Sequence, residues 1–190
     1  MLLLVGLGNP GSNSVNNRHN IGFKIIDSVN THFKLSKQKP KFKGLLTTGN
    51  IESKKIYAIK PLTFMNNSGT AIKELIDYFK IDAKDVFVFH DDMDIDFGKI
   101  KAKFGGGSAG HNGIDSIDKF IGKDYSRVRI GIGHPKQKNK VNNHVLEDFK
   151  EDEEEKIKEI AENIVKLIPT LIEKKIDLFS SKVNQNLNGI

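Results

Sequence analysis

The sequence predicts an α/β fold: a single three-layer domain over residues 1–190, in which helices flank a mixed, twisted β-sheet. Segments with strand and helix patterns alternate along the chain, and neither a repeat nor a low-complexity linker divides its 190 residues. A chain of this length buries most of the surface that its unfolded state exposes, so we expect a stable core without disulfides or a structural metal.

The first half of the chain predicts three strands and two helices. The apolar run at 2–5 indicates a buried strand, and apolar residues at helical spacing predict a helix over about 18–34. The segments LLTTGNI and KIYAIKP predict two strands joined by a turn at ESK. Apolar residues over 71–79 recur at helical spacing and predict a second helix.

The second half continues the alternation. The apolar run DVFVFH predicts a buried strand that ends near Asp91. Basic and apolar residues alternate in KIKAKFG and in RVRIGIG, which predicts two half-exposed strands on either side of a helix over 114–121. A long helical pattern starts near residue 151, and we expect Pro169 to kink or divide it.

The excess of positive charge lies before residue 147. Residues 1–146 contain 23 Lys and Arg against 13 Asp and Glu, whereas residues 147–190 contain 7 against 11. Lysines cluster at 37–43, 99–103 and 136–140. The pattern favours a polyanionic partner such as nucleic acid, although a lysine-rich surface that only maintains solubility would have the same composition.

Cysteine is absent, which excludes a disulfide framework, a thiolate zinc site and a cysteine nucleophile. Only four apolar residues follow Met1 before glycines intervene, and no basic leader precedes them. That run is too short for a signal peptide or a membrane span, so we expect a cytoplasmic protein.

The stretch VGLGNPG fits the dinucleotide-binding pattern G-x-G-x-x-G through Gly6, Gly8 and Gly11. In that motif a helix begins near the third glycine, and an acidic residue follows about 20 positions on. Here a polar stretch follows Gly11, and lysines and a proline occupy the region 34–43. The sequence therefore argues against a nucleotide cofactor.

Ser108 represents a rival chemistry. The pattern G-x-S-x-G at 106–110, with Asp124 and His134 downstream, matches the chain order of an α/β-hydrolase triad. A nucleophile elbow of that kind follows a central buried strand, whereas KIKAKF places a lysine at every second position. A Ser108 nucleophile is thus disfavoured but open.

The stretch HDDMD raises the alternative of a metal site. Adjacent side chains on a strand point to opposite faces, so His90 and Asp91 do not ligate one ion unless the chain turns there. Acidic residues that close a strand into a turn are the simpler interpretation. We expect no metal.

Three asparagines and a histidine form a more informative set. Asn9 and Asp91 fall where predicted strands end, the side of an α/β sheet where ligands bind. Asn66 and Asn112 precede predicted helices, and all three asparagines are also common turn and cap residues. His19, at the start of the first predicted helix, is the natural general base, because a carboxylate on its other nitrogen would fix its tautomer.

Six motifs narrow these alternatives. VGLGNPG, RHNIG, TFMNNSG, HDDMD, GGGSAGHNG and RIGIGHP occur in the order and approximate spacing of bacterial peptidyl-tRNA hydrolases, from residue 5 to 135. The chain resembles that family. The resemblance implies a monomeric α/β enzyme that cleaves the ester between a peptide and the terminal ribose of tRNA, with no metal, no organic cofactor, no membrane association and no obligate protein partner.

The resemblance also implies roles for single residues. His19 would be the general base that activates water, Asp91 its partner, and Asn9 a residue that helps to distinguish a blocked, peptide-like substrate. The residues implied to contact or shape the site for the peptide or the 3′ end are Ser14, Phe64, Met65, Asn66 and Asn112. Those implied to hold the 5′ phosphate of tRNA are Lys103 and Arg129.

Two positions depart from the family pattern: Ser14 replaces the usual tyrosine and Asn17 the usual threonine. Loss of an aromatic ring removes a stacking surface worth about 1–3 kcal/mol per base where stacking occurs. We expect weaker binding of the tRNA end, or compensation by Phe64. Neither change touches the implied base or its partner, so we expect catalysis to persist.

Ester hydrolysis by direct attack of water needs a general base, donors for the developing oxyanion and a substrate anchor. Asn112 and the backbone amides of residues 105–112 are alternative oxyanion donors. A noncatalytic RNA-binding relative of this fold, of the kind recruited to organelle intron splicing, is the alternative function; His19 and Asp91 favour the enzyme. The segment 135–149 is expected to form an adjustable wall of the substrate channel.

Overall fold

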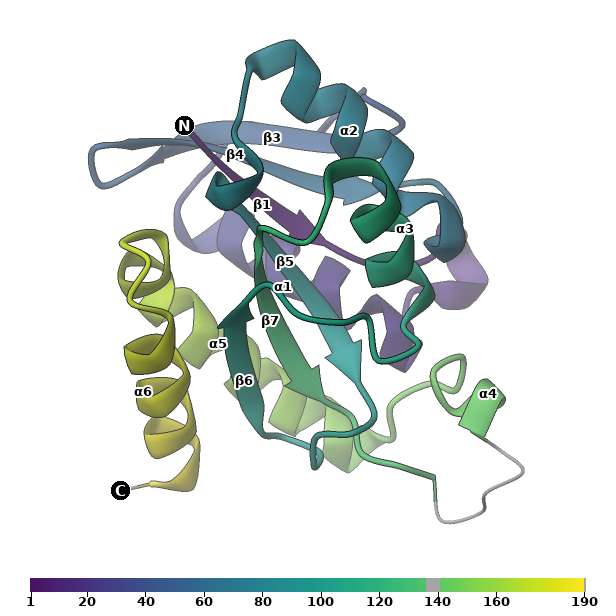
Figure 1. Ribbon diagram of the computed structural model, residues 1–190. Coiled ribbons are helices and arrows are strands. Elements are labelled where there is room, and N and C mark those ends of the chain that lie inside the picture. Colours follow the sequence, from purple (N-terminus) through teal and green to yellow (C-terminus); the bar gives the residue numbers. More distant parts are fainter. Residues whose placement is uncertain (136–140, 190) are drawn as a thin grey trace.

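The structure is a computed structural model that describes residues 1–135 and 141–189 (Figure 1). Seven strands form one sheet in the order β2-β3-β4-β1-β5-β7-β6. The strands are β1 (Leu2–Gly6), β2 (Lys39–Lys41), β3 (Gly44–Ile51), β4 (Lys54–Pro61), β5 (Val86–Asp92), β6 (Ile100–Phe104) and β7 (Ser126–Gly131). The central strands β4, β1, β5 and β7 are parallel, and the outer strands pair antiparallel. The predicted mixed sheet is confirmed.

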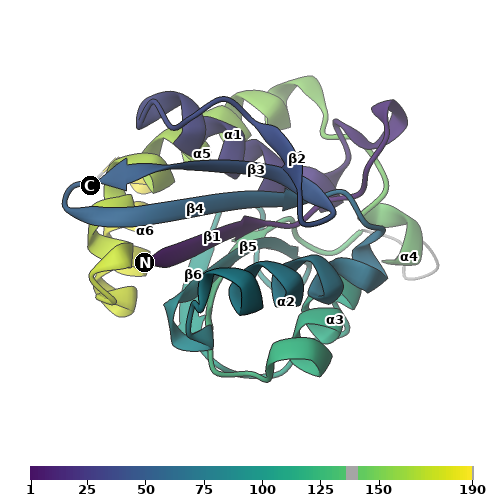
Figure 2. The ribbon, with the colours of Figure 1, turned by 90° about the horizontal axis from the view of Figure 1, so that it is seen from above.

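Helices cover both faces of this sheet. They are α1 (Ile21–His32), α2 (Ser68–Phe79), α3 (Asn112–Ile121), α4 (Val141–His144), α5 (Glu151–Ile172) and α6 (Ile176–Asn188). Figure 2 shows α2 and α3 on one face and α1 and α5 on the other, which gives the predicted three layers. In the described part of the chain, no helix is long and apolar enough to cross a membrane.

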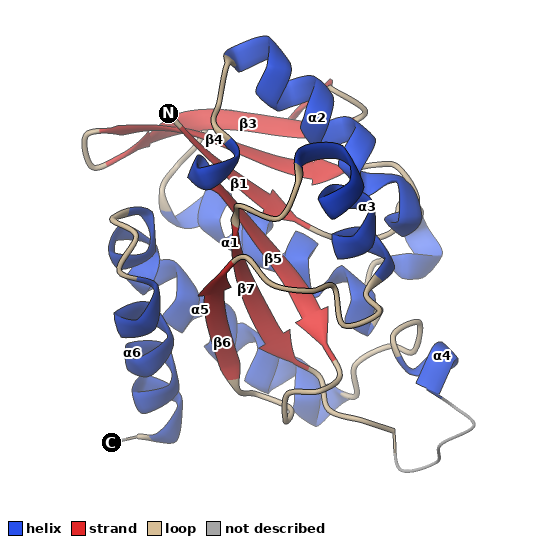
Figure 3. Cartoon of the chain, in the orientation of Figure 1, coloured by secondary structure: helices blue, strands red, loops and turns tan. Residues whose placement is uncertain are grey.

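Strand β6 forms one edge of the sheet, and α6 runs beside it (Figure 3). The Asn184 amide accepts a hydrogen bond from the backbone N–H of Ile100 and donates one to its carbonyl, at 2.9 and 2.7 Å. The Ser180 hydroxyl accepts from the backbone N–H of Ala102 at 2.7 Å. Helix α6 therefore satisfies backbone groups that an open edge strand would expose.

Apolar side chains form a core on each face of the sheet. One cluster joins the sheet to α1, α5 and α6, and the other joins it to α2 and α3. All seven residues of β5 are buried, as expected for a central parallel strand. The strand therefore projects side chains into both cores before it reaches Asp91.

The glycines of the first motif permit close packing of β1 against α1. A Cβ atom at Gly6 would overlap the carbonyl of Gly22, and one at Gly22 would overlap the backbone of Leu7 and Phe89. Only glycine fits at such a backbone contact. The start of α1, and with it the residues just before it, is therefore held against the carboxyl ends of β1 and β5.

Three local predictions need correction. The helix expected over 18–34 is α1, and its first residues form a separate 3₁₀ turn, Arg18–Asn20, so His19 does not lie in an α-helical first turn. Helix α5 is not divided at Pro169 but continues to Ile172. The helix ends there, and Lys174, two residues later, has a φ of 64°. No helix is predicted in the segment 135–149, the expected adjustable wall, yet it contains α4; its residues 136–140 lie outside the described chain.

Candidate active site

The predicted site residues gather at the carboxyl ends of the parallel strands. Asn9 follows β1, Asp91 is the second-to-last residue of strand β5, and His19 lies in the 3₁₀ turn before α1. Asn112 begins α3, and the 3₁₀ turn Met65–Asn67 precedes α2. Segments separated by up to about a hundred residues thus meet at the edge where ligands of α/β sheets bind.

Asp91 lies between two imidazole rings. Its Oδ1 is 2.7 Å from Nδ1 of His19 and 2.9 Å from Nε2 of His111. The two ring centroids are 4.8 Å apart. Because Asp91 is 1% exposed, these hydrogen bonds replace the water that a carboxylate normally binds.

The hydrogen bonds fix the tautomers of both rings. The backbone N–H groups of Gly113 and Ile114 donate to Nδ1 of His111, so that nitrogen is an acceptor and the proton is on Nε2, facing Asp91. An ionised carboxylate only accepts, so Nδ1 of His19 also carries a proton. Nε2 of His19 is then the unprotonated atom of the neutral ring, and no residue of the described chain bonds to it.

The charge state of Asp91 agrees with this assignment. Burial by itself would raise the pKa of Asp91, but the charges and hydrogen bonds of His19 and His111 hold that pKa well below its usual range. His90, its neighbour on β5, behaves differently. Burial and the nearby His111 lower the pKa of His90 well below its ordinary value, so this ring is neutral inside the fold.

The turn that contains His19 is held by a distant segment. The backbone N–H groups of Arg18 and His19 donate to the carbonyls of Glu147 and Val145, at 3.0 and 2.8 Å. The buried guanidinium of Arg18 donates from both terminal nitrogens to Glu153 at 2.9 Å. It also lies 5.0 Å from the ring centroid of Phe149.

Asn17, one of the two departures from the family pattern, adds side-chain hydrogen bonds between the turn that contains His19 and the same distant segment. Its amide nitrogen donates to Asp148 at 2.9 Å and to the carbonyl of Leu146. The segment expected as an adjustable wall therefore includes a part, residues 145–149, that is hydrogen-bonded to the turn that contains His19.

Three hydrogen bonds position Asn9. Its backbone N–H and carbonyl pair with the side-chain amide of Asn20, at 2.8 and 2.9 Å. Its Oδ1 accepts from the backbone N–H of Met65 at 2.9 Å. The amide nitrogen of Asn9 is the group that remains for a ligand, since no described residue accepts from it.

Two hollows are lined by some, but not all, of the remaining substrate candidates. A cavity of about 230 Å³ is lined by His19, Asp91 and Asn112. A neighbouring hollow is lined by Phe64 and Asn66, and the Phe64 ring is 72% exposed. Ser14 belongs to the 3₁₀ turn Ser12–Ser14 and lines neither hollow.

Lys103 and Arg129 share one face of the sheet. Lys103 lies opposite Arg127 and Lys101 opposite Arg129 in the antiparallel β6–β7 register, so all four side chains point the same way. Arg129 donates from Nε to Asp92 at 2.7 Å. Partial burial and the two neighbouring arginines lower the pKa of Lys103, and a bound phosphate would relieve that repulsion.

The serine triad is not assembled. His134 pairs with Asp94 at 2.9 Å, rather than with Ser108 or Asp124. Strand β6, which leads to Ser108, is an antiparallel edge strand and not the central strand that a nucleophile elbow requires. The geometry argues against a Ser108 nucleophile.

The cofactor and metal alternatives meet similar objections. No helix begins at Gly11; a 3₁₀ turn follows it and α1 starts only at Ile21. Potential metal ligands of His19, Asp91 and His111 lie within 4.8 Å of one another. However, both nitrogens of His111 are engaged, one as an acceptor and one as a donor, so that ring has no free lone pair for an ion.

Sequence reasoning missed His111, Asn20 and Arg18. His111 stands beside the selected Asn112, and its dual role as helix N-cap and partner of Asp91 has a weak sequence signal, a histidine between a glycine turn and a helix. Asn20 follows His19 directly, but its pairing with Asn9 depends on the fold. Arg18 depends on a partner 135 residues away, which no local pattern reveals.

Comparison with known proteins agrees with this geometry. The family model described as peptidyl-tRNA hydrolase matches residues 3–189. A peptidyl-tRNA hydrolase of Pelagibacter ubique is 72% identical over 97% of this chain and 99% of its own, and one of Bartonella henselae is 44% identical over 100% and 98%. The crystal structure of peptidyl-tRNA hydrolase from Acinetobacter baumannii superposes with a TM-score of 0.90 at 34% identity, covering 97% of this chain and 94% of that one. The chain belongs to the peptidyl-tRNA hydrolase family.

Proposed function

We propose that this protein hydrolyses the ester bond between a peptide, or an N-blocked aminoacyl group, and the 3′-terminal ribose of tRNA. It thereby recycles tRNA from peptidyl-tRNA that ribosomes release prematurely. The observation that supports this most is the fixed tautomer of His19: Nδ1–H faces Asp91, and Nε2 is left as a base beside a cavity.

In the proposed reaction, Nε2 of His19 takes a proton from a water molecule as the water oxygen attacks the ester carbonyl carbon. The bond from that carbon to the ribose oxygen then breaks, and the proton passes from His19 to the leaving oxygen. Asp91 stabilises the imidazolium between these steps. Positioned general bases of this kind contribute about 10²–10⁴-fold to a rate.

Asn9 explains why a blocked substrate would be preferred. Because Oδ1 of Asn9 already accepts a hydrogen bond from the backbone N–H of Met65, the Asn9 side chain presents its N–H donor to the ligand. A donor suits the carbonyl oxygen of an N-acyl group, which a free aminoacyl-tRNA lacks. Asn112 and the amides of the preceding glycine-rich turn remain alternative donors to the oxyanion.

The basic face of β6 and β7 supports the tRNA contact. Lys103 and Arg129 would bind the 5′ phosphate, with Asp92 orienting the arginine through Nε. Phe64 and Asn66 would contact the substrate's peptide or 3′ end. We further propose that residues 1–190 form one domain, because one sheet organises all the described elements. We also propose that the protein acts in the cytoplasm as a monomer.

The test compares N-acetyl-phenylalanyl-tRNA with phenylalanyl-tRNA as substrates for the wild-type protein and Ser108→Ala. We expect release from the acetylated substrate only, with Ser108→Ala within threefold of wild type. Loss of activity in Ser108→Ala would favour a serine esterase. Tight tRNA binding without release of either product would favour the noncatalytic RNA-binding alternative.

A further inference from the structure

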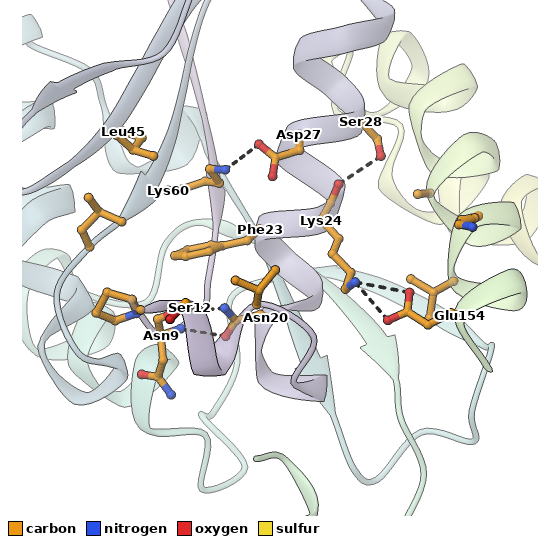
Figure 4. Close-up of a pocket in the computed structure, with 17 residues that line it drawn as sticks. Asn9, Ser12, Asn20, Phe23, Lys24, Asp27, Ser28, Leu45, Lys60 and Glu154 are labelled. Atoms are coloured by element: carbon orange, nitrogen blue, oxygen red, sulfur yellow. Dashed lines mark hydrogen bonds and ion pairs between the residues drawn. The ribbon is translucent and has the colours of Figure 1, made fainter. Parts of the chain in front are cut away.

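A large groove is lined by Asn9 but not by Asp91. It has a volume of about 640 Å³ and lies between α1, α5 and the ends of β3 and β4 (Figure 4). Asn9 and Asn20 line it, and His19, which precedes Asn20, lines the cavity that contains Asp91. A second hollow of about 520 Å³ shares Asp27 and Ser28 with it. Together they form a trough along α1, which we call the α1 groove.

Apolar groups line much of the α1 groove. Phe23 and Leu45 form its walls beside Ile157 of α5, and Figure 4 shows the Phe23 ring lying below Lys60. At the end near Asn9, Val15 and Leu62 are 56% and 41% exposed. Exposed apolar side chains around a concave surface indicate a ligand.

The charges of the α1 groove favour a neutral ligand over a nucleic acid. Lys60 pairs with Asp27 at 2.5 Å, and Lys24 pairs with Glu154 at 3.1 Å. Both of these ammonium groups are therefore compensated. Lys158 and Lys166 also line the groove and form no ion pair in the described chain, but with Glu162 the lining holds four lysines against three carboxylates. A phosphate backbone needs uncompensated cations, whereas an uncharged polypeptide does not.

Asn9 connects the lining of the α1 groove to the turn that contains His19. Its backbone pairs with Asn20 at the end of the groove, while its side chain points away from Phe23 (Figure 4). A peptide whose last carbonyl meets the Asn9 amide would leave its preceding residues at the entrance between Val15 and Leu62.

We propose that the α1 groove binds the peptide of peptidyl-tRNA upstream of the residue that is esterified to the tRNA. The proposal rests on the hydrolase function given above. Ser28 lies eight residues after Asn20, about 12 Å along α1 at 1.5 Å per residue. About four residues of extended peptide, at roughly 3.3 Å each, cover that distance. Because the tRNA tethers the peptide, weak apolar contacts suffice and no fixed sequence is required.

The test places a bulky side chain in the α1 groove. Ser28→Trp fills the part shared by the two hollows, and Ser53→Trp, in the exposed turn between β3 and β4, is the matched control. The two substrates are N-acetyl-phenylalanyl-tRNA, which is too short to reach Ser28, and a hexapeptidyl-tRNA of alternating leucine and alanine that ends in phenylalanine. The readout is the ratio of their kcat/KM values.

We expect Ser28→Trp to lower the ratio of hexapeptidyl to acetyl-phenylalanyl kcat/KM at least fivefold through the KM of the longer substrate, and Ser53→Trp to leave the ratio unchanged. Leu45→Ser, which removes an apolar wall without filling the groove, should lower the ratio two- to threefold. An unchanged ratio in both groove variants would overturn the proposal. So would an equal loss on both substrates, whereas failure of the wild type to cleave the short substrate would refute the hydrolase function instead.

Discussion

Replacement of Asp91 by asparagine separates the charge of this carboxylate from its hydrogen bonds. The same oxygen, Oδ1, accepts from His19 at 2.7 Å and from His111 at 2.9 Å. An asparagine carbonyl oxygen at that position still accepts both hydrogen bonds. Asp91→Asn therefore removes a buried negative charge while keeping both rings in place.

The lost charge matters when attack by water converts His19 into an imidazolium. Two unit charges about 4 Å apart interact by about 4 kcal/mol at an effective dielectric constant of about 20. Since about 1.4 kcal/mol corresponds to a tenfold change, kcat should fall about 10³-fold in Asp91→Asn. Asp91→Ala should lose more activity, because the tautomer and orientation of His19 are then no longer fixed.

The assay is the initial rate of N-acetyl-phenylalanine release from saturating N-acetyl-phenylalanyl-tRNA. Asp96→Asn, which neutralises an exposed carboxylate five residues further on, serves as the control and should keep kcat within threefold. Retention of more than a tenth of kcat in Asp91→Asn would show that the charge is not what Asp91 contributes.

Three other perturbations have defined outcomes. Because His90 stays neutral in the fold, the unfolded chain binds a proton below about pH 6.5 that the folded protein does not. His90 therefore makes the free energy of unfolding rise with pH by up to about 1.4 kcal/mol per pH unit between pH 5 and 6.5, and His90→Leu should remove this contribution. The same pH dependence in urea titrations of wild type and variant would contradict this. Arg127→Met removes the ion-pair partner of the largely buried Asp118, at 2.6 Å, and leaves this carboxylate with its hydrogen bond from the Tyr125 hydroxyl. It should cost about 3–5 kcal/mol of unfolding free energy, whereas a loss below 1 kcal/mol would mean that the pair is solvated. Reversing the charges of Lys103 and Arg129 should weaken tRNA binding and reduce its salt dependence by about one unit of slope per lost phosphate contact; the same slope in variant and wild type would exclude those contacts.

Local patterns predict most of the sheet because its central strands are short apolar runs bounded by charges. The run ending at Asp91 forms β5, and the alternating KIKAKFG segment forms the edge strand β6. Strand β2 was not predicted, because Lys39–Lys41 is short and contains proline. Such a segment becomes a strand only by pairing with β3 at an edge, where proline is tolerated.

The candidate site was predictable to the extent that it lies at strand ends and helix starts. Asn9 and Asp91 follow from that rule, since strand ends can be located from the sequence. His111 could not be assigned with the same reasoning, because its partner belongs to another strand. The hydrogen bonds between residues 16–19 and 145–149 are even harder to predict from the sequence, since they join segments almost 130 residues apart.

The opening glycine motif shows how one pattern supports two structures. Gly6 satisfies a dinucleotide-loop pattern, yet in this fold it lets Gly22 approach the end of β1. The distinction depends on where the following helix begins, and α1 begins ten residues after Gly11. The 3₁₀ turn Arg18–Asn20 occupies part of that interval and places His19 beside Asp91.

The central claim is that His19 activates water for ester hydrolysis. The most direct test measures kcat and KM of wild type and His19→Ala on N-acetyl-phenylalanyl-tRNA, together with tRNA affinity. A general base worth about 10²–10⁴-fold predicts a loss of that size in kcat, with KM and tRNA affinity within threefold of wild type. A kcat within tenfold of wild type, or an equal loss of tRNA binding, would contradict the assignment.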